Sequence, residues 1–504
     1  MDESRLDLSW RGRAHEALVA RTWDLLVVGG GIVGAGIAAE AARAGLAVAL
    51  LDRADFASAT SSASSKLIHG GLRYLRLGDV RLVREAHRER RALLRVVAPH
   101  LVRRLPFLVP LYPGSPYRPT TLQAGLWLYS TLARERIGGL APPERARRSV
   151  PDLRLGELRG CGVYADAWTN DARLCLANIR AAADAGATVL NYAEVVALRT
   201  ERGRVAGADV RDALDGSQFG VRARAVVNAT GPWVDRVRRL EDPAAGPSSR
   251  LSKGVHVVVP LRQPWSAALT LLHSKVRISF AVPWDGLLLL GTTDTLYDGD
   301  PAEVRATADD VRQVLDEAAL GVDPELLRPE LVLSTYAGVR VLPGAAGETT
   351  TARRETVFLR GPGGMLSVAG GKLTTYRRIA LEALARLRVD LGLGRLDASP
   401  RPLPGAARPA EVAARLARTY RELDPTARSH LAHRYGSLAD EVLAPARDDP
   451  SLLERLHPEA PELAAEAAYA IEREWATGPD DVLRRRTTLA LRGLGQDADV
   501  LGRA

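Results

Sequence analysis

Mostly apolar residues near the start of the chain form two short runs with a helix-like stretch between them. Trp23–Val28 is an apolar run of strand length, and Ala35–Ala44 has the composition of a helix. Gly45 ends that stretch, and Leu46–Leu51 is a second apolar run. The three segments predict a βαβ unit, and therefore a fold of the α/β class.

The same kinds of pattern continue as far as about residue 400. Strand-like runs are expected at Thr188–Leu190, Ala225–Ala229, Val255–Pro260, Leu287–Gly291 and Leu366–Ala369. Helical patterns are expected at Val80–Val97, Thr121–Ala133, Asp171–Ala185, Ala308–Ala319 and Thr375–Leu391.

Four prolines between Pro400 and Pro409 indicate a linker, after which the pattern becomes purely helical. We therefore expect an N-terminal extension (1–21), a main region (22–400) and a separate all-helical domain (401–504). The helical patterns of that last domain cover Ala410–Leu423, Thr426–Tyr435, Pro461–Thr477 and Pro479–Leu494.

The composition narrows the class of protein. With 504 residues, 46% apolar and 26% charged, the chain is globular. Cys161 and Cys175 are too few for a disulfide framework and do not match a zinc site, so no metal is expected. The N-terminus lacks the apolar core of a signal peptide, and no uncharged stretch reaches the roughly 20 residues that span a bilayer. We expect a soluble or peripheral, cytoplasmic protein.

The net charge of +9 is concentrated in one segment. Arg81–Arg148 contains 14 arginines against four acidic residues, a local net charge of +10. Three interpretations stay open: an ordinary solvated helical face, a surface for anionic lipid, or nucleic-acid binding. The last is disfavoured because no recognised nucleic-acid module is present.

Lysine is rare among the 69 basic residues, since only Lys66, Lys253, Lys275 and Lys372 are not arginine. Lysine is a compact point charge, whereas arginine is a wide, permanently charged fork. We therefore expect Lys66, Lys253 and Lys372 to mark places where arginine would not serve, and we assign no such role to Lys275.

The turn between the first strand and helix has the spacing Gly29-x-Gly31-x-x-Gly34, and Asp52 closes the second strand. Glycines here allow a tight turn and close approach of a pyrophosphate to the helix N-terminus, and the acid can accept from a ribose hydroxyl. This predicts a dinucleotide site. The motif does not separate FAD from NAD.

Three further motifs lie downstream. Residues 59–75 read ATSSASSKLIHGGLRYL, and such small hydroxyl residues suit a chain laid tightly against a cofactor. Residues 226–233 form a strand-like run ending in Ala-Thr-Gly, and residues 370–377 (GGKLTTYR) form a glycine turn that opens a helix.

In this order and spacing, the four motifs resemble the FAD-dependent glycerol-3-phosphate dehydrogenases, within the larger superfamily of glycine oxidase and D-amino-acid oxidase type flavoproteins. The resemblance runs from Trp23 to Leu494 and includes Ser252–His256, Gly291–Asp294 and Tyr336–Arg340. It implies an FAD-binding Rossmann-like βαβ domain, an interleaved antiparallel-sheet substrate domain and an all-helical C-terminal domain.

The resemblance also implies which residues hold FAD. The ADP half would lie against Gly29, Gly31, Ile32, Val33, Gly34, Asp52 and Arg53. The pyrophosphate and ring would be wrapped by Thr60, Ser61, Ser62, Ser65, Lys66, Leu67, Ile68 and His69. Val195 would touch the adenine through its backbone, and Ala229, Thr230 and Gly231 would line the cofactor. Gly371, Lys372, Leu373 and Thr374 would sit at the O2 and N1 end of the flavin.

For the substrate, sn-glycerol 3-phosphate, the resemblance implies two groups of residues. Arg73, Tyr74, Arg340 and Arg353 match positions around the phosphate or nearby hydroxyls, although Arg354 could take the place of Arg353. His69, Lys372 and Thr374 match positions near the reacting carbon. We expect His69 to be the base and Lys372 to polarise the oxygen, with an exchange of these roles left open.

The implied function is oxidation to dihydroxyacetone phosphate with transfer of electrons to a membrane quinone, by an enzyme on the inner face of the cell membrane. The apolar stretches Leu101–Tyr112 and Leu122–Leu132 are candidates for shallow insertion. Alternatives are an oxygen-using oxidase, an oxidase of another small substrate such as an amino acid, and a non-catalytic flavin- or nucleic-acid-binding protein. A homodimer is a further option, and no nucleic-acid partner is expected.

Overall fold

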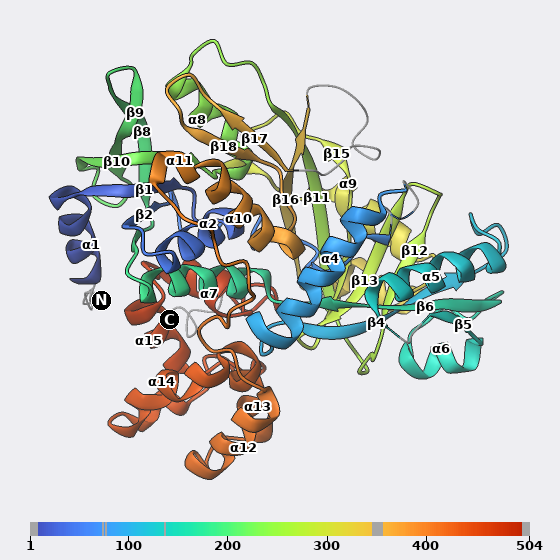
Figure 1. Cartoon of the computed structure of the whole chain (residues 1–504). Helices are drawn as coiled ribbons and strands as arrows, with labels where there is room; N and C mark the ends of the chain where they lie inside the picture. The colour runs from blue at the N-terminus through green and yellow to red at the C-terminus, as the bar shows by residue number, and fades with distance from the viewer. Residues whose placement is uncertain (1–8, 73–74, 76–77, 136–137, 345–355, 496–504) are drawn as a thin grey trace.

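The computed structural model describes residues 9–72, 75, 78–135, 138–344 and 356–495 (Figure 1). Within them, two sheets lie side by side and a group of helices lies against one of them. This confirms the mixed α/β class with antiparallel and helical parts.

The first sheet is built around β1 (Thr22–Val28), which pairs in parallel with β2 (Val48–Leu51) on one side and β10 (Gln218–Asn228) on the other. Helix α2 (Ile32–Arg43) connects β1 to β2, so the expected βαβ unit is present. Among the described residues the sheet has the order β17-β18-β10-β1-β2-β7, with β9 beside β10 and β8 beside β9. The remaining strands are β7 (Thr188–Leu190), β8 (Ala193–Glu201), β9 (Arg204–Asp212), β17 (Val357–Arg360) and β18 (Leu366–Ala369).

The second sheet is largely antiparallel. Its described strands have the order β15-β11-β14-β13-β12-β4-β6-β3, with β16 also on β11 and β5 on β6. Their bounds are β3 (Leu67–Ile68), β4 (Arg103–Leu111), β5 (Gly139–Ala141), β6 (Gly160–Trp168), β11 (Ser249–Pro260), β12 (Ala268–Leu272), β13 (Ile278–Trp284), β14 (Leu287–Gly291), β15 (Thr295–Leu296) and β16 (Ser334–Pro343). Because β3 follows the first βαβ unit in sequence, the serine-rich stretch before it bridges the two sheets.

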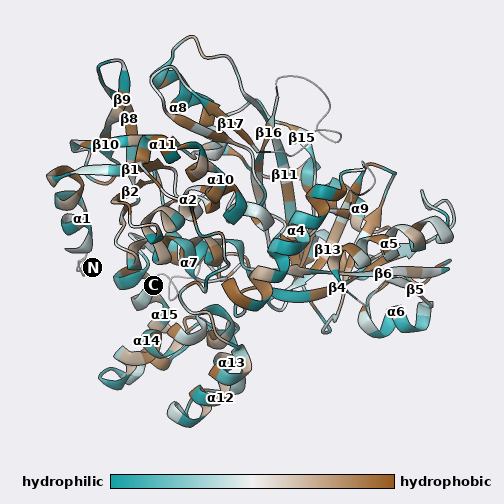
Figure 2. Ribbon diagram, viewed as in Figure 1, coloured by the Kyte–Doolittle hydropathy of each residue, from teal (hydrophilic) through white to brown (hydrophobic). Residues whose placement is uncertain are grey.

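Among the described residues of the main region, the α-helices are α1 (Ser9–Ala20), α2, α4 (Val80–Ala92), α5 (Pro119–Ala133), α6 (Pro143–Ser149), α7 (Asp171–Asp184), α8 (Val234–Glu241), α9 (Ala308–Ala318), α10 (Tyr376–Arg386) and α11 (Arg388–Leu391). Figure 2 shows hydrophobic residues along the strands, whereas α4 and α6 are largely hydrophilic. None of the described helices is long and apolar enough to cross a bilayer.

The C-terminal helices are α12 (Pro409–Thr419), α13 (Pro425–Arg434), α14 (Ala439–Leu443), α15 (Ala464–Arg473) and α16 (Pro479–Asp481). They enclose an apolar cluster of their own, which includes Val412, Leu416, Leu431 and Val442. In Figure 1 these orange and red helices lie below the main body, beside α7.

Two expectations from the hydrophobic pattern are wrong. Leu101–Tyr112 is not available for insertion, because it contains the sheet strand β4 and its apolar side chains are buried. Pro479–Leu494 is not one helix: α16 runs into a π-helical segment, Val482–Arg486, and stops. The Thr487 hydroxyl donates back to the carbonyls of Val482 and Leu483, and such local hydrogen bonds compete with helix continuation.

Candidate active site

The turn after β1 depends on its glycines. Gly29 has a φ of +109°, and a Cβ there would lie 2.6 Å from the carbonyl oxygen of Ala229. A Cβ on Gly34 would collide with the carbonyl of Gly29. Only glycine permits this close packing, which brings the N-terminus of α2 to the edge of the sheet, where backbone N–H groups and the helix dipole favour an anion.

Asp52 follows β2 directly and is held at the same edge. Its carboxylate accepts from the backbone N–H of Gly30 at 2.6 Å and of Ala54 at 2.9 Å. Burial raises the pKa of Asp52 to about 6, although these two hydrogen bonds oppose the shift. Further donors, such as ribose hydroxyls, would favour the charged form.

The serine-rich stretch crosses from the first sheet to the second and is anchored at several points. Thr60 Oγ1 donates to the carbonyl of Val339 at 2.6 Å, and Ser61 Oγ accepts from the N–H of Ile32 at 2.9 Å. Ser64 donates through both its backbone N–H and its hydroxyl to Asp171. These bonds hold the stretch against the start of α2, strand β16 and the first turn of α7.

Lys66 lies in this stretch but points away from the cavity that the stretch lines. Its φ of +56° is left-handed, and its Nζ donates to Asp171 Oδ1 at 2.6 Å and to the carbonyl of Ser62 at 3.0 Å. Both side chains of the Lys66–Asp171 pair are almost fully buried. Lys66 thus ties the serine-rich stretch to the first turn of α7.

The far end of the site is formed by the turn after β18. Thr374 Oγ1 accepts from the N–H of His69 at 3.1 Å and lies 3.2 Å from the carbonyl of His69, to which it can donate. Lys372 and Leu373 lie on the same turn. His69 and the Gly371–Thr374 turn are therefore in direct contact, although they are far apart in sequence.

Arg340 projects from β16 across its neighbour β11. It donates to Thr292 Oγ1 at 2.8 Å and to the carbonyl of Thr293 at 3.2 Å. A Cβ on Gly254 of β11 would collide with the Arg340 guanidinium, with Nη1 at 2.6 Å. The glycine leaves the space in which this side chain lies.

Two cavities that share lining residues bring these groups together. The larger, of about 940 Å³, follows the edge of the first sheet from Asp52 to Thr374. The smaller, of about 140 Å³, extends between strands of the second sheet. Both are lined by Ser65, Leu67, His69 and Arg340.

Most of the expected cofactor residues line the larger cavity. They are Gly29, Gly31, Ile32, Val33, Asp52, Arg53, Thr60, Ser61, Ser65, Leu67, His69, Val195, Ala229, Thr230, Gly231, Gly371, Lys372, Leu373 and Thr374. Gly34, Ser62, Lys66 and Ile68 do not line it, because Gly34 packs on Gly29, Lys66 and Ser62 bond to each other, and Ile68 is a buried strand residue. Arg73, Tyr74, Arg353 and Arg354 lie outside the described residues.

Residues of the cavity that sequence reasoning missed include His256 and, behind the serine-rich stretch, Asp171. His256 stacks on Tyr336 with ring centroids 4.7 Å apart, and its Nε2 lies 2.9 Å from Ser65 Oγ. Burial, with the nearby charges of Arg340 and Lys66, lowers the pKa of His256 well below its usual value, so the ring is neutral. Asp171 follows Asn170 at a helix start, a pattern that by itself indicates only a cap.

The chain is similar over most of its length to known proteins. A model of the FAD dependent oxidoreductase family matches residues 24–377, and a model of the C-terminal domain of alpha-glycerophosphate oxidase matches residues 398–503. The aerobic glycerol-3-phosphate dehydrogenase of Escherichia coli (strain K12) is 38% identical, across 92% of this chain and 94% of that protein. The chain belongs to the FAD-dependent glycerol-3-phosphate dehydrogenases.

Two further members of this family support the assignment. Glycerol-3-phosphate dehydrogenase 2 of Mycobacterium tuberculosis (strain H37Rv) is 37% identical, across 95% of this chain and 83% of that protein. The structure of the Bacillus halodurans glycerol-3-phosphate dehydrogenase, complexed with FAD, has a TM-score of 0.78 and 30% identity, covering 96% of this chain and 89% of that one. The dehydrogenase family thus accounts for both sheets and the C-terminal helices.

The residues around the larger cavity fit the FAD of this family. The glycine turn, the helix N-terminus and the half-buried Asp52 offer the groups that a dinucleotide needs at its ADP half. The indole N–H of Trp233 is buried beside the cavity and has no acceptor among the residues that the structure describes. FAD carries many acceptor atoms, so an indole N–H without a protein acceptor beside this cavity is consistent with FAD binding there.

Proposed function

We propose that this chain oxidises sn-glycerol 3-phosphate to dihydroxyacetone phosphate. The observation that carries the proposal is that His69 and Arg340 both line the 140 Å³ cavity and also the larger cavity beside it. One side chain suits a proton acceptor and the other suits a phosphate, and the space between them admits only a small molecule.

Arg340 would bind the phosphate. Its guanidinium is oriented by the Thr292 hydroxyl and the Thr293 carbonyl, so its position is set before the substrate arrives. A planar fork of donors suits the oxygens of a phosphate dianion. Arg73, Tyr74 and Arg353 would complete the phosphate and hydroxyl contacts.

His69 would take the proton of the C2 hydroxyl, and Lys372 would polarise its oxygen. When bound, FAD supplies the acceptor for the hydride that leaves C2. The Thr374 hydroxyl makes hydrogen bonds to the backbone of His69. These bonds fix the position of the His69 Cα, from which the side chain extends, relative to Lys372. The neighbouring His87 is buried, and burial with nearby arginines lowers its pKa to about 3, so it adds no charge beside His69.

Anaerobic addition of glycerol 3-phosphate to the purified protein tests this proposal. Loss of the oxidised flavin absorbance within the mixing time is the expected result. An unchanged spectrum with FAD still bound would contradict it. Competitive inhibition by inorganic phosphate, and no bleaching by amino acids, would exclude the other substrates of the superfamily.

The electron acceptor is proposed to be a membrane quinone. A second candidate is oxygen, favoured by the match of residues 398–503 to a domain named for an oxidase. Steady-state assays separate the two: a quinone analogue should be reduced at a rate well above that of peroxide formation in air. Stoichiometric peroxide with no quinone reduction would favour the oxidase.

We propose that the surface of α5 and β5 faces anionic lipid. It exposes Trp127 (64%), Leu128 (41%) and Leu140 (42%), with Arg118 and Arg134 exposed at the two ends of α5. Exposed apolar side chains beside arginines suit an interface of acyl chains and anionic headgroups. Not every arginine of the segment contributes, since Arg90 is buried against Asp166 and Glu135.

Flotation with vesicles tests the lipid proposal. At low salt the protein should float with phosphatidylglycerol vesicles and not with phosphatidylcholine vesicles, and Trp127→Ser should weaken the binding. The variant Leu214→Ser, at an exposed apolar residue outside this surface, is the matched control. Absence of flotation in both lipids would contradict the proposal.

A further inference from the structure

The edge of the larger cavity nearest Asp52 is made of two chain segments that pair with each other. The N–H of Tyr192 donates to the carbonyl of Ala54 at 3.1 Å, and the N–H of Ala193 donates to the carbonyl of Asp52 at 2.7 Å. We name the segments 52–56 and 191–195 together the adenosine edge, because Asp52 and Val195 are the proposed ribose and adenine contacts. Its position decides the shape of that end of the cavity.

The C-terminal helices hold the adenosine edge through buried charges. Arg485 and Arg486 both donate to the carboxylate of Asp55, with Arg486 Nη2 2.9 Å from Asp55 Oδ1. The side chains of Asp55 and Arg486 are 1% and 0% exposed, so this ion cluster is fully inside the protein. Burial raises the pKa of Asp55, and the two guanidiniums more than offset this, so it lies below its usual value and the carboxylate is charged.

The second segment of the edge is held by the same helices. Asn191 Nδ2 donates to the carbonyl of Trp475 at 2.8 Å, and the Tyr192 hydroxyl donates to Asp481 Oδ1 at 2.7 Å. All of these contacts are between residues nearly 300 or more positions apart. Both segments of the adenosine edge therefore depend on residues 475–486.

The contact continues to the glycine turn. The ring of Phe56 packs edge-on against Trp475, with centroids 5.8 Å apart. On its other side, a Cβ on Gly30 would collide with the Phe56 ring, and the N–H of Ala57 donates to the carbonyl of Gly30 at 3.2 Å. A shift of Phe56 would therefore move the backbone that receives the pyrophosphate.

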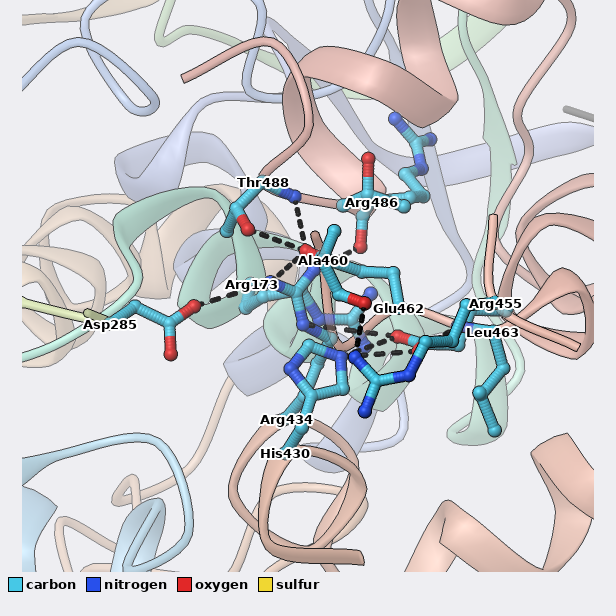
Figure 3. A network of polar contacts seen from close by, with 12 residues as sticks. Arg173, Asp285, His430, Arg434, Arg455, Ala460, Glu462, Leu463, Arg486 and Thr488 are labelled. Atoms are coloured by element: carbon cyan, nitrogen blue, oxygen red, sulfur yellow. Dashed lines mark hydrogen bonds and ion pairs between the residues drawn. The ribbon is translucent and has the colours of Figure 1, made fainter. Parts of the chain in front are cut away.

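A network inside the C-terminal helices keeps Arg486 in place (Figure 3). Arg434 donates to the carbonyl of Arg486 and lies 3.6 Å from the carboxylate of Glu462. Glu462 in turn accepts from the N–H of Thr488 at 2.8 Å. The backbone on both sides of Thr487 is thereby fixed, and with it the direction of the Arg485 and Arg486 side chains.

One residue of the same segment reaches the cavity itself. Arg484 lines the larger cavity, with its side chain 61% exposed and 3.5 Å from Asp480. A cation at the rim, on the segment that also binds Asp55, suits the negative charge of a dinucleotide pyrophosphate.

We propose that residues 475–486 of the C-terminal helices form a clamp that retains FAD by its adenosine half. The clamp consists of Arg485 and Arg486 on Asp55, Trp475 on Phe56, and Arg484 at the rim. The inference requires that FAD binds in the larger cavity and is independent of which substrate is oxidised, so it can fail while the proposed function stands.

Release of FAD measures the clamp directly. The holoenzymes of Arg486→Met and Asp55→Asn are diluted, and the flavin fluorescence that appears on release gives the dissociation constant and rate. We expect the dissociation constant to rise roughly tenfold or more in both variants, because a buried charge loses its partner and the edge relaxes. Arg484→Ala, at an exposed side chain that is not needed for folding, should raise it by a smaller factor, with a weaker dependence on salt than the unaltered protein.

The matched control is Arg180→Met, which removes another arginine between α7 and the C-terminal helices. Arg180 binds Glu441 and the Tyr469 hydroxyl and touches neither segment of the adenosine edge. The melting temperatures of this variant and of Arg486→Met are compared by circular dichroism, with FAD in excess. The clamp is supported if the control retains FAD at equal loss of stability. It is overturned if the control releases FAD as readily, or if Asp55→Asn and Arg484→Ala both bind FAD within about twofold of the unaltered protein.

Discussion

The hydroxyl of Thr374 lies between the backbone N–H and the backbone carbonyl of His69, at 3.1 Å and 3.2 Å. Two segments 305 residues apart, each carrying residues of the proposed chemistry, are thus joined by one side chain. This hydrogen-bonded pair fixes His69 and Lys372 in one arrangement.

Thr374→Val should therefore lower kcat without releasing FAD. Valine keeps the shape but removes both hydrogen bonds, and a small displacement of catalytic groups costs between roughly tenfold and a hundredfold in rate. Steady-state kinetics with a quinone analogue, together with the flavin-to-protein absorbance ratio, measure this. Thr374→Ser, which retains the hydroxyl, is the control and should stay close to the unaltered rate; equal losses in both variants would contradict the role given to the hydroxyl.

Arg340→Ala should raise KM for glycerol 3-phosphate and leave FAD bound. A charge-assisted hydrogen bond contributes about 1.5–3 kcal/mol, which corresponds to a KM roughly 10- to 100-fold higher. Gly254→Ala should produce a similar change without altering any charge, since its Cβ would displace the guanidinium. If Arg340→Ala instead loses FAD while its KM is unchanged, Arg340 belongs to the cofactor and not to the phosphate.

FAD affinity should fall as the pH drops below 6. Burial raises the pKa of Asp52 to about 6 without the cofactor, and the ionised carboxylate is a much stronger acceptor for ribose hydroxyls than the protonated acid. FAD then binds with its full affinity above pH 6, where Asp52 is ionised. Protonation of Asp52 weakens the binding, so the affinity falls by roughly tenfold between pH 7 and pH 5. Without FAD the sign is opposite: the raised pKa means that this carboxyl destabilises the fold as the pH rises through 6. Fluorescence titrations of the apoprotein should show the slope, and Asp52→Asn should remove it.

Lys66→Met should destabilise the protein by about 3–5 kcal/mol, because it leaves the buried carboxylate of Asp171 without its cation. Urea unfolding monitored by circular dichroism gives the free energy of unfolding. Lys253→Met, at a pair with Asp310 that is more exposed, should cost less. Lys66→Arg should also destabilise, since Nζ lies close to two aromatic rings, 5.1 Å from the centroid of Trp284 and 5.3 Å from that of Tyr336, which leaves little room for a guanidinium. An arginine variant as stable as the unaltered protein would refute the view that this lysine is kept for its compact shape.

The sequence predicts the parts of the fold that rest on local pattern. The βαβ unit, the strands at Thr188–Leu190 and Leu287–Gly291, and the meeting of Asp52 with the glycine turn follow from periodicity and spacing. The direction of Lys66 does not, because a left-handed backbone at one non-glycine residue turns the side chain away from its neighbours in the motif. The burial of Leu101–Tyr112 cannot be predicted from the pattern either. An apolar strand that lies between two other strands has the same sequence pattern as an apolar stretch on the surface.

The contacts between distant segments were also beyond local pattern. The sequence around Asp55 and the sequence around Arg486 contain no motif that predicts an ion pair. Only the packing of the C-terminal helices brings these two residues together. The same holds for α1, which lies in the segment predicted only as an N-terminal extension. Its Arg11 donates to the carbonyl of Asn191 at 2.7 Å and to Asp212 at 2.7 Å, so this helix also supports the adenosine edge.

The pairing of Asp55 with Arg485 spans 430 positions in the sequence. On a ribosome that adds about 5–20 residues per second, Arg485 would emerge between roughly 20 and 90 s after Asp55. The dinucleotide-binding unit can fold in that interval, but the side chains that close on its adenosine edge do not yet exist. Tight binding of FAD would then begin only near the end of synthesis. Retained flavin would therefore report chains that have been translated through residue 486.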